Sequence, residues 1–336
     1  NKLDKRVIFA VAGSGKTTYI VKALSTDKRS LIVTYTNNNY DNLSRKILKR
    51  FNGIWPQNIT LMTYFQFLFR FCYKPFLADK IGAKGIVFEA NTSRHFTKKD
   101  KGYYLTPNGY FYSNRLSLYL EVVEVISDIK ERIETYFDEF VIDEIQDVAG
   151  RDFSFLELLM ETNVNMLFVG DFYQHTYDTS RDGNVNKALF NNRALYEDRF
   201  VQRGLVCDTT TLQNSWRCSK NICNFVSTNL GIPINTNRSD NTFIRFVSDE
   251  SEIAHILEND AIIKLHLQNS AKFGKGRKNW GETKGEDHYQ DVCVMLNKGT
   301  MGKYNAGKLS ELAPSTRNRL YVAITRAHGN VYLLSE

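Results

Sequence analysis

The sequence lacks the features that mark secreted, membrane-spanning and zinc-binding proteins. Its five cysteines are an odd number without a CxxC pair, so neither a disulfide framework nor a zinc site is indicated, and we expect reduced thiols. The longest apolar runs, such as Met166 to Val169, are far too short to cross a bilayer. No signal peptide precedes the first strand-like segment, so we expect a cytoplasmic protein, and the missing initiator Met indicates that residues precede Asn1.

What the sequence does contain is a globular composition with a basic balance. Of the 336 residues, 42% are hydrophobic and 24% are charged, which excludes a disordered chain. The length favours two domains, each large enough for its own core. The net charge of +7 favours a polyanionic partner, because each neutralised phosphate releases counterions.

Strand-like and helix-like segments alternate along the chain, which predicts parallel sheets covered by helices on both faces. In the first series we expect strands at 6–10, 30–35, 59–62, 139–142 and 165–169, and helices at 16–24, 40–51 and 65–73. In the second series we expect strands at 209–212, 243–247, 261–266, 291–296 and 330–334, and helices at 219–230, 250–258 and 316–327. We therefore predict an α/β protein with a first domain at 1–204, carrying an insertion at about 74–134, and a second domain at 205–336.

Residues 10–17 form a phosphate loop of the GxxxxGK[ST] type, with Ala10 in the first glycine position. The loop follows a strand and opens a helix, and a plain glycine-rich turn would not explain Lys and Thr in register. Backbone N–H groups and the helix N-terminus favour phosphate here. We expect Lys16 to contact the β- and γ-phosphates and Thr17 to bind Mg²⁺. The residues expected to bind ATP are Ala12, Gly13, Ser14, Gly15, Lys16, Thr17 and Thr18.

Two carboxylates, Asp143 and Glu144, follow the apolar run 140–142. Ligands of parallel sheets lie at the carboxyl ends of strands, so we expect Asp143 to bind Mg²⁺ and Glu144 to take a proton from the attacking water. An acidic turn that caps the next helix is the alternative, but it does not explain the apolar run. Gln174, after the strand at 165–169, is a candidate sensor of the γ-phosphate.

Two arginines in the second half, Arg217 and Arg326, are candidates for stabilising the γ-phosphate in the transition state. An arginine finger contributes about 10³–10⁵-fold in rate. Taken singly, each arginine is more often a surface or salt-bridge residue. We expect both to meet one MgATP in the cleft between the two halves.

In their order along the chain, these motifs resemble those of the UvrD/Rep group of superfamily 1 helicases. The segments 12–17, 143–147, 170–177 and 321–327 are similar to its nucleotide loop, its DExQD signature, its GDxxQxxY motif and its final arginine motif. The resemblance implies a P-loop NTPase of two RecA-like parallel-sheet domains with a small helical insertion in the first. It also implies ATP and Mg²⁺ as cofactors and ATP-driven movement, 3′ to 5′, on single-stranded DNA.

The resemblance further implies individual contacts to the ligands. Trp216 stands where the family has a Tyr that stacks on adenine, and either Glu286 or Asp287 would be the acidic ribose contact. The implied contacts to nucleic acid are Thr36, Asn37, Thr63, Tyr64, Tyr177 and Thr283.

Two basic, aromatic-rich stretches, 94–104 and 272–280, lie outside these motifs. Cations follow phosphates, and aromatic rings stack on bases at about 1–3 kcal/mol per base. For 94–104 a solvated loop explains the pattern equally well. The second stretch borders Thr283, so we expect Lys275, Arg277 and Lys278 to bind single-stranded DNA, with RNA as the alternative.

The chain also departs from the family pattern. No glutamine motif precedes Arg6, so adenine specificity is open, and Thr179 or Ser180 stands where a base-stacking aromatic is usual. The stretch between Trp216 and Lys284 is too short for a large accessory subdomain. The alternative function is therefore a nucleic-acid-responsive ATPase switch that regulates a partner nuclease or effector, as in Gabija-type anti-phage systems. A nucleotide-binding scaffold without turnover is disfavoured by the presence of Glu144 and the two arginines.

Overall fold

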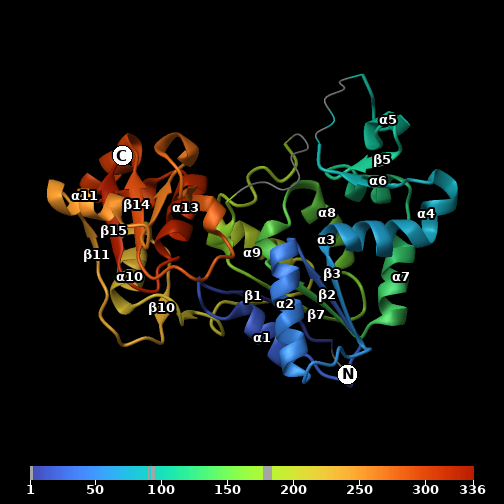
Figure 1. Cartoon of the computed structure of the whole chain (residues 1–336). Coiled ribbons are helices and arrows are strands. Elements are labelled where there is room, and N and C mark those ends of the chain that lie inside the picture. The colour runs from blue at the N-terminus through green and yellow to red at the C-terminus, as the bar shows by residue number, and fades with distance from the viewer. Residues whose placement is uncertain (1–2, 90, 92–94, 177–183) are drawn as a thin grey trace. The chain divides into compact units, whose positions relative to one another are not determined.

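The computed structural model describes residues 3–89, 91, 95–176 and 184–336 (Figure 1). The chain divides into two compact units. The first comprises Asn1–Ile8, Thr17–Gly170 and Asp178–Asp208, and the second comprises Phe9–Lys16, Asp171–Tyr177 and Thr209–Glu336. Two short segments of the first half of the chain, the phosphate loop and the segment after residue 170, thus pack with the second unit.

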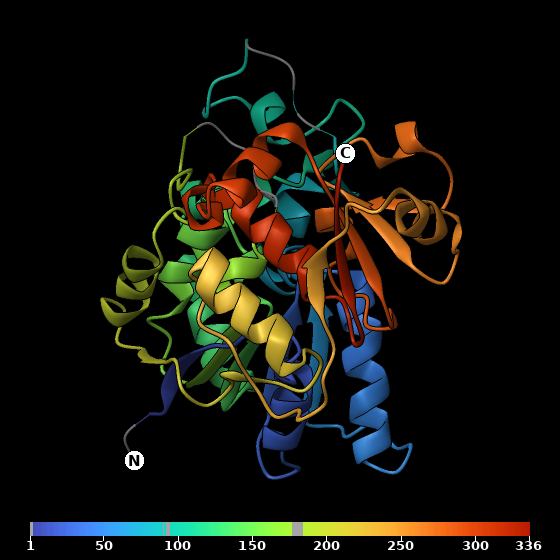
Figure 2. The same ribbon diagram turned by 90° about the vertical axis from the view of Figure 1, so that its left-hand side faces the viewer.

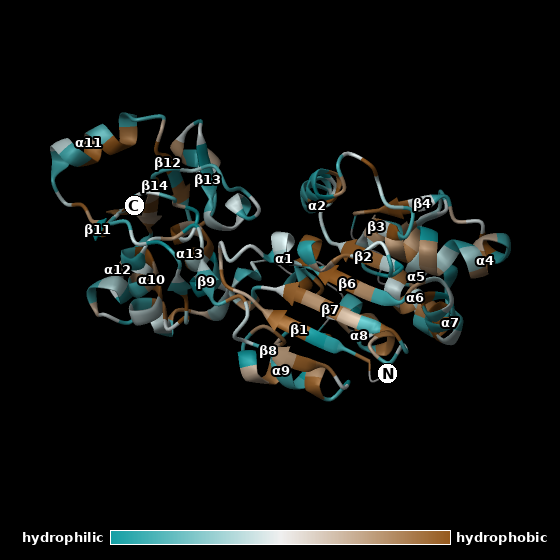
Figure 3. Ribbon diagram, turned by 90° about the horizontal axis from the view of Figure 1, so that it is seen from below, coloured by the Kyte–Doolittle hydropathy of each residue, from teal (hydrophilic) through white to brown (hydrophobic). Residues whose placement is uncertain are grey.

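The first unit contains a six-stranded sheet with the order β3-β2-β6-β7-β1-β8. Its strands are β1 (Lys5–Phe9), β2 (Ser30–Thr34), β3 (Ile59–Thr63), β6 (Glu139–Asp143), β7 (Asn165–Gly170) and β8 (Val206–Asp208). The pairs β1/β8, β2/β3, β2/β6 and β6/β7 run parallel. Figure 3 shows β1, β6 and β7 as largely hydrophobic, as expected for strands covered on both faces. Asp143 and Gly170 end adjacent parallel strands, so they lie along one edge of the sheet.

Local signals explain where the helices of this sheet begin. The Thr36 side chain accepts a hydrogen bond from the Asn39 N–H and starts α2, while Thr63 and Gln66 form a capping box at α3. The helical elements are α1 (Lys16–Ala23), α2 (Asn37–Arg50), α3 (Tyr64–Gln66), the π-helix η1 (Phe67–Tyr73), η2 (Ile145–Asp147), α8 (Gly150–Leu159) and α9 (Arg193–Val201).

The insertion has a small aromatic core of its own. It consists of α4 (Lys74–Ile81), β4 (Gly85–Val87), α5 (Lys101–Tyr104), β5 (Tyr110–Tyr112), α6 (Leu116–Val122) and α7 (Ile126–Tyr136), with β4 and β5 paired in parallel. The rings of Tyr73 and Phe111 lie 4.9 Å apart, and those of Tyr104 and Tyr119 lie 5.0 Å apart. Because aromatic side chains from short elements build this core, the sequence shows little helical or strand period here.

The second unit contains a five-stranded parallel sheet with the order β11-β15-β14-β12-β13. The strands are β11 (Ile244–Phe246), β12 (Ile263–His266), β13 (Arg277–Asn279), β14 (Val292–Leu296) and β15 (Val331–Ser335); a separate pair is β9 (Asn214–Ser215) and β10 (Asn235–Thr236). The helical elements are η3 (Phe172–Gln174), α10 (Lys220–Phe225), η4 (Val226–Leu230), α11 (Glu250–Glu258), η5 (Ser270–Phe273), η6 (Trp280–Thr283), α12 (Lys298–Asn305), η7 (Leu309–Glu311) and α13 (Pro314–Ile324). Figure 2 shows α10 with η4 in yellow and α13 in red-orange, and both pack into one core with β14 and β15.

The structure confirms an α/β fold with two parallel sheets, corrects one predicted strand and adds one that the sequence did not indicate. The strand predicted at 209–212 is wrong, because these residues form bends and turns, and the strand is instead β8 at 206–208, paired with β1. Residues 277–279, inside the basic stretch 272–280 for which no element is predicted, form the edge strand β13 beside β12. The partner of β8 is distant in sequence, so local pattern does not locate it, and the basic residues of β13 do not resemble an ordinary strand.

Among the described residues, no helix combines the length and the apolar character that a membrane crossing requires.

Candidate nucleotide site

The phosphate loop joins β1 to α1 and is held in a conformation that only glycine accommodates. Gly13 and Gly15 have φ angles of 70° and 87°, in the left-handed region that glycine enters without steric cost. A Cβ atom on Gly13 would lie 2.6 Å from the Cβ of Arg217 and 2.7 Å from the Ser215 hydroxyl. Within the described part of the chain, the buried Ser14 hydroxyl has no hydrogen-bond partner. A loop closed this tightly, with one unsatisfied polar atom, fits a site for an oxygen-rich anion.

Gly13→Ala is expected to lower ATP turnover by at least about tenfold, because the added methyl group forces Arg217 and the loop apart. Gly53→Ala is the matched control, since Gly53 also has a positive φ, of 83°, but a Cβ there would meet nothing within 4 Å. Steady-state ATPase assays and melting temperatures of both variants separate the steric clash from backbone strain. An equal fall in activity in the two variants would contradict the prediction.

The acidic pair lies where β6 ends. Asp143 is buried, with 2% of its surface exposed. Glu144 adopts a left-handed backbone with φ 59° and ψ 50°, which costs a non-glycine residue about 1–3 kcal/mol. The Gln146 side-chain amide donates to the Glu144 carboxylate. A strained backbone that is retained at a carboxylate, together with a side chain that orients that carboxylate, is typical of a catalytic position.

Gly170 at the end of β7 allows this turn to pack closely. A Cβ on Gly170 would clash with Oε1 of Gln146 and lie 2.7 Å from the Ile145 side chain. The next residue, Asp171, caps η3 by accepting a hydrogen bond from the Tyr173 N–H at 3.1 Å, and Gln174 closes that turn with 3% of its surface exposed. The segment after β7 is thus fixed in place by the side chain at its start.

Trp216 and Arg217 lie directly against the phosphate loop. The Trp216 N–H donates to the carbonyl of Gly13 at 2.8 Å, while Trp216 as a whole is 67% exposed, so its indole ring faces solvent. The Arg217 guanidinium donates to Asp287 at 2.6 Å and to the Thr325 carbonyl at 3.1 Å. These bonds hold Arg217 in one orientation beside Gly13.

Arg326 is buried among backbone carbonyls. Its guanidinium donates to the carbonyls of Val322, Thr283 and Glu286 at 3.2, 3.4 and 3.1 Å. Burial, and then the positive charge of Arg217, lower the pKa of Arg326 to about 10. The side chain is therefore still protonated at neutral pH. The two arginines meet the same short segment, because Arg217 binds Asp287 and Arg326 binds the carbonyl before it.

The two candidates for the acidic ribose contact are both engaged in the structure. Glu286 accepts hydrogen bonds from Lys278 and Tyr289, and these bonds lower its pKa although burial opposes the shift. Asp287 accepts hydrogen bonds from Arg217 at 2.6 Å and from His328 at 2.8 Å. Burial raises the pKa of Asp287, but the charge of Arg217 and these bonds outweigh burial, so the pKa is lowered. Both carboxylates are held ionised, and Asp287 is the one bonded to a residue at the phosphate loop.

The described residues contain no cluster of three or more His, Cys, Asp or Glu side chains arranged to hold a metal ion. Mg²⁺ seldom needs such a cluster, since it prefers oxygen ligands and is commonly bound through one or two protein groups together with substrate phosphates. The Thr17 hydroxyl at the start of α1 and the Asp143 carboxylate at the end of β6 are hard oxygen donors that fit this ion. Thr18 follows on the exposed side of α1.

The residues predicted to bind nucleic acid are divided between the two units. Thr36 and Asn37 stand at the start of α2, with Asn37 exposed. Thr63 and Tyr64 are 7% and 4% exposed, and Tyr64 lies against the buried Asp152, whose pKa burial raises to about 7. Tyr177, like Thr179 and Ser180, lies outside the described residues.

The remaining predicted contacts lie near β13. Thr283 is fully buried, and its hydroxyl donates to the Trp280 carbonyl at 3.0 Å. Lys275 is exposed, Lys278 forms an ion pair with Glu286, and Arg277 lies 3.3 Å from His266. Of these three cations, Lys275 is the one that faces solvent most openly.

Sequence reasoning missed three residues that orient the predicted ones. Gln146 holds the Glu144 carboxylate. The Ser215 hydroxyl accepts from the N–H groups of Arg217 and Cys218 at 3.2 and 3.0 Å. The Arg238 guanidinium donates to the carbonyls of Arg217 and His328. Gln146 belongs to the DExQD pattern and could have been found there, and Ser215 forms a local turn of the kind that Ser favours, whereas Arg238 acts through contacts that no local pattern indicates.

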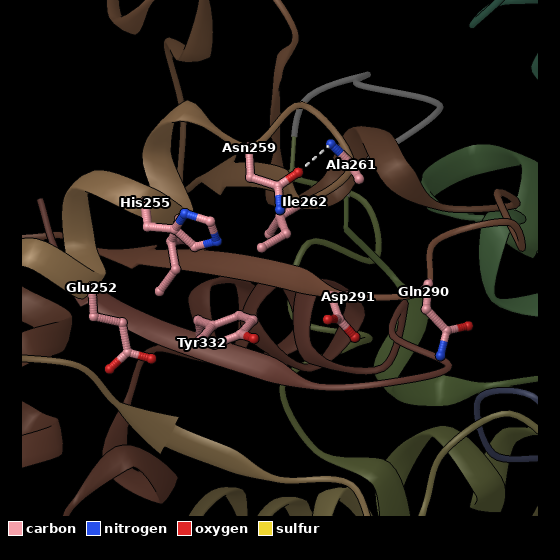
Figure 4. Close-up of a pocket in the computed structure, with 9 residues that line it drawn as sticks. Glu252, His255, Asn259, Ala261, Ile262, Gln290, Asp291 and Tyr332 are labelled. Atoms are coloured by element: carbon pink, nitrogen blue, oxygen red, sulfur yellow. Dashed lines mark hydrogen bonds between the residues drawn. The ribbon is translucent and has the colours of Figure 1, made fainter.

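A separate cavity of about 220 Å³ lies near the amino ends of β14 and β15. Its polar lining includes Glu252, His255, Asp291 and Tyr332 (Figure 4). The loop at its rim is closed by a hydrogen bond from the Ala261 N–H to the Asn259 side chain at 3.0 Å. Ligands of parallel α/β sheets bind at the carboxyl ends of strands, so this cavity is distinct from the candidate nucleotide site.

Comparison with protein families assigns the chain. Residues 3–180 match the AAA_19 family, described as an AAA domain, and this is more than half of the 336 residues, so the chain belongs to that family. AAA_19 domains occur in UvrD/Rep-like helicases. No curated protein matches the sequence.

Comparison of structures agrees with this assignment. The chain is similar to arterivirus nonstructural protein 10, a helicase whose structure was solved with DNA, with a TM-score of 0.51 and 15% identity over 98% of the chain. The chain spans 60% of the length of that protein. At this identity the likeness shows the fold. Family and fold together place the chain in the superfamily 1 helicase group, with the fold of a P-loop NTPase of two RecA-like domains.

Proposed function

We propose that the protein is an ATP-dependent DNA helicase or translocase of UvrD type. It hydrolyses MgATP and moves 3′ to 5′ on single-stranded DNA, with RecA-like domains at 1–204 and 205–336. The observation that carries this proposal is the placement of Arg217, whose Cβ would meet a Cβ on Gly13 at 2.6 Å. An arginine held at the phosphate loop is what stabilisation of a γ-phosphate requires.

The roles of the individual residues follow from their chemistry. Lys16, with the loop N–H groups, binds the phosphates, while Thr17 and Asp143 would hold Mg²⁺, which would neutralise phosphate charge. Glu144 takes a proton from the attacking water, oriented by Gln146. Gln174 senses the γ-phosphate, and Arg217 and Arg326 stabilise its charge. Trp216 offers an exposed ring for the adenine base.

Binding of single-stranded DNA is supported by two observations. The structurally similar arterivirus helicase was solved with DNA, and this chain carries a net charge of +7. A basic protein gains affinity for nucleic acid through counterion release, and this contribution does not depend on the base sequence. We propose that Thr36, Asn37, Thr63, Tyr64, Tyr177 and Thr283 contribute contacts, together with Lys275, Arg277 and Lys278.

A specific observation favours a second candidate function. The residues between Trp216 and Lys284 form elements of the second unit, from α10 to η6, and no large subdomain is inserted there. Such an uninterrupted core suits an ATPase switch that responds to nucleic acid and regulates a partner nuclease or effector.

ATPase activity titrated with single-stranded DNA and single-stranded RNA, followed by a strand-displacement assay, tests both functions. Strong stimulation by DNA together with strand displacement supports the motor. Stimulation without displacement supports the switch. Stronger stimulation by RNA than by DNA would indicate that RNA is the substrate. Lys16→Ala serves as the control for contaminating ATPases, since it removes the phosphate-binding cation. No turnover under any condition would refute both functions.

Replacing Lys275, Arg277 and Lys278 together by Ala is expected to weaken binding to single-stranded DNA. The slope of log affinity against log salt concentration should fall by about 0.7 for each phosphate that these cations no longer neutralise. The matched control replaces Lys298, Lys303 and Lys308, which carry the same total charge and lie in or after α12. Fluorescence-anisotropy titrations at several salt concentrations measure the slopes. Equal slopes for the two triple variants would exclude a direct role for the cations around β13.

A further inference from the structure

Side chains of helix α13 donate hydrogen bonds to the segment that follows β7. The Tyr321 hydroxyl donates to Asp171 at 2.9 Å. The Asn318 amide donates to the His175 carbonyl at 3.1 Å, and the Arg319 guanidinium donates to the Thr176 carbonyl at 3.2 Å. Tyr321 and Asn318 are 0% and 1% exposed and lie three residues apart on one face of the helix.

The same Tyr321 hydroxyl also contacts the phosphate loop. It accepts a hydrogen bond from the Ala12 N–H at 2.8 Å while it donates to Asp171. Burial, and then the charge of Asp171, raise the pKa of Tyr321 well above its usual range, so the hydroxyl stays protonated. One buried hydroxyl therefore connects two segments that are far apart in sequence, and its direction of donation is set.

Both of these segments carry residues of the candidate site. Ala12 directly precedes Gly13, against which Arg217 packs. Asp171 caps η3, the turn that ends at Gln174. The C-terminal end of α13 leads into Thr325, whose carbonyl accepts from Arg217. A shift of α13 relative to either segment thus changes the position of the loop, of Gln174 and of Arg217 together.

We propose that Tyr321 is a positioning residue that couples the phosphate loop to the Gln174 segment. As a result, the position of Gln174, which senses the γ-phosphate, changes together with the positions of the arginines. This inference rests on the proposed ATPase function, since it assigns a regulatory role within that site. Tyr321 itself does not touch ATP in this scheme, because it is fully buried and its hydroxyl proton is donated to Asp171 while its oxygen accepts from Ala12.

Tyr321→Phe removes the hydroxyl and keeps the ring. We expect kcat for DNA-stimulated ATP hydrolysis to fall by about tenfold, with KM for ATP changed far less, because alignment rather than nucleotide binding is impaired. Tyr73→Phe is the matched control, since Tyr73 is also fully buried and its hydroxyl accepts from a backbone N–H, that of Ala83 at 2.9 Å, in the insertion. A merely structural tyrosine would lower the melting temperature as Tyr73→Phe does and leave kcat unchanged well below that temperature.

A second variant, Asp171→Asn, tests the hydrogen bond itself. Asn retains the oxygen that caps η3 but replaces the acceptor of the Tyr321 hydroxyl by an amide donor. If the two residues act as a unit, the double variant loses no more activity than the worse single variant. If the loss of activity in the double variant equals the product of the two single losses, the residues act independently and the proposal is overturned.

Amide hydrogen exchange makes the test independent of catalysis. In Tyr321→Phe, residues 9–16 and 171–176 should both exchange faster than in the parent protein, and in Tyr73→Phe neither should. If the parent protein shows no ATP turnover, the proposed function fails while exchange still decides the coupling. If the parent protein hydrolyses ATP and Tyr321→Phe matches it in kcat and in exchange, only the coupling fails.

Discussion

Glu144→Gln is expected to lower ATP turnover by about 10²–10⁴-fold, the range that a general base contributes, while ATP binding is retained. Gln has the same shape as Glu but cannot take a proton from water. The backbone conformation at residue 144 should survive the change, and the amide oxygen of Gln can still accept the hydrogen bond from Gln146, although without the charge that strengthens it. Steady-state ATPase rates together with binding titrations of a fluorescent ATP analogue measure the two quantities separately.

The matched control for this substitution is Glu139→Gln. Glu139 lies at the opposite end of the same strand, β6, where it accepts a hydrogen bond from Ser30. The control loses one charge in the same element but should retain turnover. Retained turnover in Glu144→Gln would show that another group acts as the base.

Arg217→Ala is expected to have the second large effect, a fall in kcat of about 10³-fold or more, as for the removal of an arginine finger. Alanine keeps the Cβ that packs against Gly13, so the loop should retain its shape and bind ATP. Arg217→Lys should recover little activity, since the single ammonium group cannot reproduce the bonds to both Asp287 and Thr325.

The control for the arginine is Arg245→Ala. Arg245 belongs to the same unit and pairs with Glu252, with 46% of its side chain exposed. Its removal should leave the ATPase rate unchanged, because exposed ion pairs contribute little. A rate for Arg217→Ala close to that of Arg245→Ala would remove Arg217 from the mechanism. The placement of Arg217 at the phosphate loop would then no longer support the proposed function.

The fold class and the positions of several strands and helices could be predicted, because they depend on local pattern. Apolar runs predicted β1, β2, β6 and β7 to within about one residue, and Lys16 opens α1 as the phosphate-loop motif requires. The threonine-rich run at 209–212 was misread as a strand, since its residues favour strands but find no partner strand there. The insertion at 74–134 gave no period, because its core is made of aromatic side chains from short elements.

For the candidate site, the sequence indicated which residues carry the chemistry but not how they are held. Tyr64 and Thr283 were expected to face nucleic acid, and the structure places both in the interior. Arg326 was expected beside Arg217, and the two do approach the same segment, but Arg326 is surrounded by carbonyls of the chain itself. The expectation that these residues bind nucleic acid or ATP stays a prediction for the experiments above.

By itself, the sequence determined the chemical groups of this protein: a loop of glycines with Lys16, two acids after a buried run, and arginines in the second half. These follow from spacing over a few residues, where covalent geometry leaves few choices. The tertiary structure alone decided their partners, such as the bond between Ala12 and Tyr321 across 309 residues. Contacts of that range arise when whole elements pack, so no local pattern encodes them.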